Sequence, residues 1–175
     1  MISESEKEQF LKIFGDHFNT VDEQAQILLK GHLLIEEKLY DIISNFVFHP
    51  DALEKAKLGF YQKLHLARSL SLDESNSSMW ELVLAINSLR NKIAHKLATE
   101  EREKPLELVK MLFTKEMAED ELKNVWDTQG AVVGLSYSIS LVLGFLLSFE
   151  KESIRFKEIT EKLDLIINTH RHKNE

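Results

Sequence analysis

Residues 79–98 read MWELVLAINSLRNKIAHKLA, and their apolar side chains recur every three or four positions. This period is typical of an α-helix with one face turned towards a core. The apolar stripe consists of Leu82, Ile86, Leu89, Ile93 and Leu97. Ser78 followed by Glu81 matches a capping box, which marks a helix start. We therefore expect an amphipathic helix over residues 79–98, with this stripe facing the core.

The opposite face of this expected helix mixes small, amide and ionisable side chains. It carries Val83, Asn87, Arg90, Asn91, Ala94 and His95. Such a mixture fits a partly buried protein–protein contact better than a fully solvated face. We therefore expect two copies of the chain to pair through this face as a homodimer. The expected contact residues are Val83, Asn87, Arg90 and Ala94.

The flanking segments also show helical periodicity and few turn residues. Helices are expected over residues 3–18, 20–47, 51–70, 131–149 and 151–169, with shorter pieces between 105 and 125. Thr20 is the expected start of the second helix, and His49-Pro50 is the expected break after it. Residues 73–77 and 99–105 are expected to be connecting loops. The fold class that follows is an all-α, up-and-down bundle of about five long helices with short extra pieces.

The run from Ala131 to Phe149 carries no formal charge in 19 residues. This approaches the length of a membrane span, but the run also holds four Ser, two Gly and a Tyr. A helix that is apolar on nearly every face is typical of the centre of a bundle. We therefore expect a core helix here, and no membrane partner. Gly130 and Gly134 match GxxxG and are expected to mark a close helix contact.

The bulk composition indicates one globular domain. The chain has 175 residues, 43% of them apolar, with only six Gly and two Pro. We expect a single helical domain over residues 1–175, with its core at about 20–169. The chain has no cysteine, which excludes disulfides and thiolate metal sites. The acidic, polar start lacks the features of a secretory signal, so a cytoplasmic location is expected.

The formal charge is unevenly distributed. The whole chain carries −7, whereas residues 55–96 hold seven Lys/Arg and three Asp/Glu, a local +4 that leaves −11 for the rest. An acidic protein repels nucleic acid on average, but a local basic segment permits phosphate contact. The RNKIAH sequence at 90–95 lies inside this basic segment.

Arg90, Asn91 and His95 are the candidate catalytic residues. The imidazole of His95 could transfer a proton near neutral pH, and the guanidinium of Arg90 could hold a phosphate. Asn91 could position either group by hydrogen bonds. Arg90 and His95 lie about 140° apart around a helix, so a shared site would need Arg90 of one copy and His95 of another. This chemistry requires no metal and no cofactor, and the sequence suggests neither.

These residues resemble the HEPN superfamily, whose mark is an arginine followed four to six residues later by a histidine within a helical bundle. The preceding segments LGFYQKL (58–64) and ARSL (67–70) are similar to HEPN-like bundles, including the mannitol-operon repressor family. The resemblance covers about residues 20–150. It implies RNA cleavage, RNA or nucleotide binding, or a regulatory role. HEPN toxins paired with a nucleotidyltransferase usually carry a tyrosine two positions after the histidine, where this chain has Leu97.

Several interpretations of this motif stay open. The first is a dimeric, metal-independent endoribonuclease of toxin or defence type. The second is binding of RNA or nucleotide without cleavage. The third is a structural role for Arg90 and His95, as an interhelical salt bridge and a satisfied histidine. The chain would then be an interaction module, such as a regulator or an acidic immunity protein that covers a basic nuclease toxin. The remaining histidines, including His32 and His65, are expected to be structural or to lie at the surface.

Overall fold

The computed structural model describes residues 4–18, 22–72, 77–95 and 102–169. These residues are mostly helical, and no strand occurs among them, so the predicted all-α class is confirmed. The helices are α1 (Glu4–Phe18), α2 (Glu23–Phe46), α3 (Pro50–Lys55), α4 (Phe60–Leu70), α5 (Ser77–His95), α6 (Glu103–Glu116), α7 (Asp120–Lys123) and α8 (Val125–Ile167).

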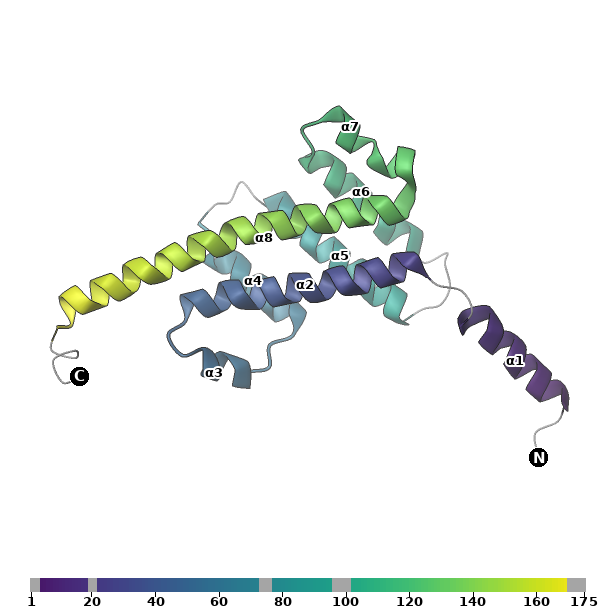
Figure 1. Cartoon of the computed structure of the whole chain (residues 1–175), viewed down its shortest axis with the longest axis horizontal. Helices are drawn as coiled ribbons and strands as arrows, with labels where there is room; N and C mark the ends of the chain where they lie inside the picture. The colour runs from purple at the N-terminus through teal and green to yellow at the C-terminus, as the bar shows by residue number, and fades with distance from the viewer. Residues whose placement is uncertain (1–3, 19–21, 73–76, 96–101, 170–175) are drawn as a thin grey trace.

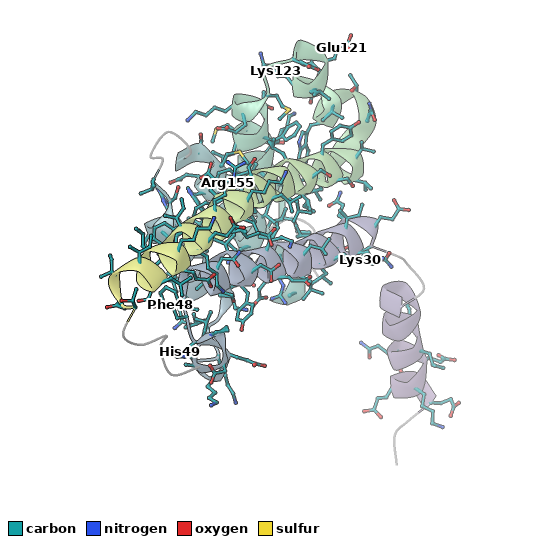
Figure 2. The ribbon with its side chains drawn as sticks, turned by 60° about the vertical axis from the view of Figure 1, so that its left-hand side comes forward. Lys30, Phe48, His49, Glu121, Lys123 and Arg155 are labelled. Atoms are coloured by element: carbon teal, nitrogen blue, oxygen red, sulfur yellow. The ribbon has the colours of Figure 1, made fainter. Side chains whose placement is uncertain are left out.

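The long helices α2 and α8 lie side by side and form the main helix pair (Figure 1). Helices α4 and α5 pack against α2, and α6 packs against both α5 and α8. Helix α1 stands apart from this body in the same view. Figure 2 shows Glu121 and Lys123 of α7 at one extremity of the molecule, and Phe48 and His49 in the turn after α2.

The core lies between α2, α5 and α8. The described residues of the predicted α5 stripe, Leu82, Ile86, Leu89 and Ile93, are all buried, as expected. Trp80 is also buried, with its ring edge-on to Phe145 at 5.1 Å between centroids. Such an edge-to-face pair stabilises by about 0.5–1.5 kcal/mol beyond the area it buries. The prediction that this stripe of α5 faces the core is therefore confirmed for its described residues.

Gly31 sets how closely α2 approaches α8. A Cβ atom placed on Gly31 would lie 2.5 Å from Cδ1 of Ile139, closer than real Cβ contacts. Glycine therefore lets the Ile139 side chain rest directly on the α2 backbone. Because core side chains are close-packed, this contact fixes the spacing of the two longest described helices.

The predicted single helix over residues 51–70 is wrong, because the chain breaks between α3 and α4. Lys57 adopts a left-handed conformation with φ of 48°, which ends α3. Gly59 then caps α4, and its backbone N–H donates to Oε1 of Gln62 at 2.8 Å. Apolar periodicity continues across the break, so periodicity alone did not reveal it.

The two helices predicted on either side of residue 150 form one continuous helix. The kink in α8 lies instead at Gly130, whose φ is 83°. This positive φ folds residues 125–129 back so that the indole of Trp126 covers Gly134. The GxxxG pair thus marks a kink and a tryptophan contact, where a contact between two helices was predicted.

Helix α8 is less enclosed than the predicted core helix. Leu135, Val142 and Leu146 are fully buried, but Tyr137 and Leu147 on its outer side are exposed. Within the described part of the chain, α8 alone combines the length and apolar composition of a membrane span, and only part of that segment is buried. The predicted core helix is therefore present, but its outer side is exposed.

Several predicted boundaries change or fall outside the described residues. Asp22 caps α2, since its Oδ1 accepts the backbone N–H of Ala25 at 3.0 Å. Pro105 lies in the first turn of α6, which begins at Glu103, so residues 103–105 are helix and not loop. A proline fits there because first-turn N–H groups have no partner inside the helix. Thr20, residues 73–76 and residues 96–101 lie outside the described residues.

Candidate functional site

Arg90 lies near the C-terminal end of α5 and is half-buried. Its Nη1 donates to Oδ1 of the neighbouring Asn91 at 3.1 Å. Its Nε is buried and has no hydrogen-bond partner among the described residues. The ion pairs formed between described side chains do not include Arg90. Among the described residues, the Nη groups thus keep donors available for an anion, which is the property a phosphate-binding residue needs.

His32 of α2 forms a polar cluster with Asn87 and Arg90 of α5. It is only 4% exposed, and its ring stacks on Phe60 with 4.3 Å between centroids. Its Nε2 lies 2.9 Å from Oδ1 of Asn87 on α5. The expected structural role of His32 is consistent with this burial, but its link to the motif helix was not predicted. The helical spacing of Leu28, His32 and Ile35 could have placed it on the core face.

The electrostatics of the cluster keep His32 neutral. Burial lowers the pKa of His32 most strongly, and the positive charge of Arg90 lowers it further. The hydrogen bond to Asn87 and the carboxylate of Glu36 oppose these effects without reversing them. Glu36 is itself paired with Lys63, at 2.8 Å between Oε1 and Nζ. The cluster therefore combines an imidazole in the core, its pKa lowered, with the arginine cation of Arg90 beside it.

An open groove of about 490 Å³ lies beside these residues, between α4, α5 and α6. Its polar lining consists of Glu81, Asn87, Ser88 and Asn91, all from α5. Its apolar lining consists of Tyr61, Leu84, Ala85, Leu108, Met111 and Leu112. Tyr61 and Met111 are exposed, so the groove opens to solvent. Asn91 connects the two features, because it lines the groove and accepts a hydrogen bond from Arg90.

The predicted site residues are only partly brought together by the described contacts. Arg90 and Asn91 are in contact, and His95 ends α5 five residues later, about 7.5 Å further along the helix axis. The His95 side chain lies outside what the structure describes. The link between Arg90 and His95 of another copy therefore stays a prediction.

The predicted pairing face needs one correction. Val83 is fully buried in the core and is not available on that face. The buried side of α5 is wider than one stripe, because α6 packs against α5 in addition to α2 and α8. Asn87 and Arg90 are half-buried and Ala94 is exposed, so these three remain accessible. Leu84, half-buried in the groove wall, replaces Val83 on the accessible side.

Comparison with known protein families, with characterised proteins and with solved structures finds no match to this chain.

Proposed function

We propose that this chain is an HEPN-like protein that acts on RNA as a homodimer, using Arg90, Asn91 and His95. In this proposal α2, α4, α5, α6 and α8 are the five helices of an HEPN-like bundle. The observation that carries it is the state of Arg90: a half-buried cation outside the described ion pairs, held by Asn91 at the edge of an open groove. A guanidinium in this position can bind an anion through its Nη groups.

The proposed reaction is metal-independent cleavage of single-stranded RNA. His95 takes the proton of a ribose 2′-hydroxyl, and the 2′-oxygen attacks the adjacent phosphorus. The bond from phosphorus to the 5′-oxygen breaks, and that oxygen takes a proton from solvent or from the second His95. The products are a 2′,3′-cyclic phosphate and a 5′-hydroxyl. Arg90 would stabilise the extra negative charge on the phosphate as the bond forms.

The homodimer of this proposal pairs the accessible sides of two α5 helices. Leu84 and Ala94 offer apolar contact, and Asn87 offers an amide at the same surface. Paired across a two-fold axis, the α5 helices would bring Arg90 of one copy towards His95 of the other. The groove would then become a shared cleft, lined by amides that can hydrogen-bond to RNA.

The experiment compares wild-type protein with His95→Ala and Arg90→Ala on a labelled single-stranded RNA in excess EDTA. We expect the wild type to produce fragments that end in a cyclic phosphate. Loss of a general acid–base group should slow cleavage by about 10²–10⁴-fold in His95→Ala. Lys92→Ala is the matched control, since Lys92 is an exposed cation on the same helical turn. Circular dichroism establishes that each variant is folded.

Two results would reject the proposal. Intact RNA after prolonged incubation with folded wild-type protein would remove the nuclease function. Equal slowing by Lys92→Ala and Arg90→Ala would show that only overall charge matters, and not the position of Arg90.

A further inference from the structure

The C-terminal part of α8 runs past the rest of the body (Figure 1). Helix α2 ends at Phe46, whose ring lies 5.0 Å from the ring of Phe156. Helix α8 continues to Ile167, about 16 Å beyond Phe156. No residue of the segment 157–167 is buried. This segment therefore has no covering neighbour in the described chain.

The projecting segment carries an apolar stripe at coiled-coil spacing. Phe156, Ile159, Leu163 and Ile166 follow one another at intervals of three, four and three residues, and are 49%, 58%, 49% and 71% exposed. Towards the N-terminus the same seven-residue register passes through Phe149, Val142 and Leu135, which are buried in the core. A stripe of this period is the seam along which two helices pack. The face of α8 that packs inside the body thus continues onto the projecting segment, where no described residue covers it.

An apolar pocket of about 370 Å³ opens where the exposed stripe begins. Its lining residues are Phe46, Ser69, Leu70, Leu72, Phe149, Glu152 and Phe156. Leu72 is fully exposed at its edge. Phe156 belongs both to the pocket and to the stripe, so the two form one continuous apolar surface. A continuous exposed apolar surface on a folded domain marks a contact site for a protein or a membrane.

We propose that this surface pairs with the same surface of a second copy, with the two α8 helices antiparallel. The two-fold axis crosses α8 between residues 157 and 158. Phe156 then faces Ile159 of the partner subunit, and Ile166 faces Phe149 of the partner subunit. Leu163 and Ile166 of each copy enter the pocket of the other. A single interface of this kind covers the exposed stripes of both copies and fills both of their pockets.

Charge selects the antiparallel over the parallel arrangement. In a parallel pair Glu152 would face its own copy, placing two carboxylates together in the seam, and the pocket would stay open. In the antiparallel pair Glu152 faces Leu163 of the partner subunit, so the two Glu152 carboxylates lie apart. Avoidance of this contact between like charges therefore favours the antiparallel orientation.

This interface is separate from the proposed pairing through α5. Phe46, at the pocket, lies about 20 Å along α2 from His32, which contacts the motif helix. The two surfaces can therefore be tested independently, and the α8 interface does not rest on the proposed RNA activity.

The absence of cysteine allows a direct test by disulfide trapping. In the double variant Glu152→Cys/Leu163→Cys, mild oxidation should produce a covalent dimer on a non-reducing gel. The single variant Leu163→Cys should not cross-link, because Leu163 does not face itself. Glu161→Cys, on the opposite side of the helix, is the matched control. A covalent dimer of the single variant Leu163→Cys would show a parallel pair, and no cross-link in the double variant would show no pair; either result overturns the proposal.

Sedimentation equilibrium tests the same interface without cysteines. Leu163→Asp/Ile166→Asp should reduce the assembly to the α5-paired dimer, or to one copy where α5 does not pair, and leave helix content unchanged, since neither side chain is buried within one copy. Leu165→Asp, equally exposed but outside the stripe, should keep the full mass. An unchanged mass in Leu163→Asp/Ile166→Asp would overturn the proposal. A second result would also overturn the proposal: wild-type protein that does not pair through α8 in solution but floats with phospholipid vesicles through Ile166.

Discussion

The Nε2 atom of His32 lies 2.9 Å from the Oδ1 atom of Asn87, and this contact joins α2 to the helix that carries Arg90. Because Oδ1 can only accept, the hydrogen of His32 stands on Nε2. The buried ring also stacks on Phe60 of α4. One side chain of α2 therefore fixes the rotation of α5 and the position of α4. The polar side of the motif helix is held in place from within the core.

Removal of the Asn87 amide should destabilise the fold. Asn87→Ala leaves the N–H of a buried imidazole without its acceptor, which costs about 1–3 kcal/mol of unfolding free energy. Urea denaturation followed by circular dichroism measures this loss. Ser88→Ala is the matched control, because Ser88 lies next along α5 and is exposed. Equal stability of the two variants would show that the His32–Asn87 contact contributes nothing.

Stability should fall as the pH drops below the ordinary pKa of histidine. Burial, and then the charge of Arg90, lower the pKa of His32 in the folded chain below 6.5. Between these two pKa values the unfolded chain binds a proton that the folded chain does not. The free energy of unfolding should therefore be constant above about pH 7 and decrease from there towards pH 5.

The experiment for this pH dependence compares wild type with His32→Gln between pH 5 and pH 7.5. The substitution removes the titrating group, so the decrease should become smaller. His65→Gln is the control, since His65 is an exposed histidine that packs only edge-on against Tyr61. A wild-type profile that His32→Gln leaves unchanged would contradict the assignment.

The sequence predicted those features whose causes are local. The buried stripe of α5 follows from spacing alone, and Leu82, Ile86, Leu89 and Ile93 are buried as predicted. The break before α4 was missed because a left-handed Lys57 leaves no compositional signal. The continuity of α8 was missed because the charges after Phe149 resemble a helix boundary, although charged side chains do not stop a helix.

In the candidate site, too, contacts between neighbouring residues were predictable from the sequence, and contacts between distant residues were not. Arg90 and Asn91 were found by their spacing, and adjacent residues on one helix can meet. The role of His32 was missed because 55 residues separate it from Asn87, and only the packing of α2 on α5 brings them together. Val83 was placed on the wrong side because the sequence does not show how many helices surround α5.

Gly31 should tolerate no side chain. In Gly31→Ala the new Cβ would meet Ile139, and such overpacking costs about 1–3 kcal/mol. Gly144→Ala is the matched control: its Cβ would meet nothing within 4 Å in the same helix pair. Alanine there should stabilise the helix by about 0.5–1 kcal/mol. Thermal unfolding should therefore shift in opposite directions for the two variants. The double variant Gly31→Ala/Ile139→Ala should lose less than the sum of its single variants, because the clash is shared.

Asp22 should stabilise α2 both as a cap and as a charge. Partial burial raises the pKa of Asp22, but the backbone N–H of Ala25 and the guanidinium of Arg102 together hold it below 3.8. The stabilisation is thus present above pH 3.8 and is lost as the pH falls through the lower, folded-state pKa.

Asp22→Ala should cost about 0.5–2 kcal/mol at neutral pH through loss of the cap. Asp22→Asn keeps a capping oxygen and removes only the charge, so its deficit at neutral pH should be smaller and should vanish in acid. Denaturation at pH 7 and pH 3 separates the two contributions. An Asn variant as unstable as the Ala variant would show that the ion pair with Arg102, and not the cap, determines the stability of this end of α2.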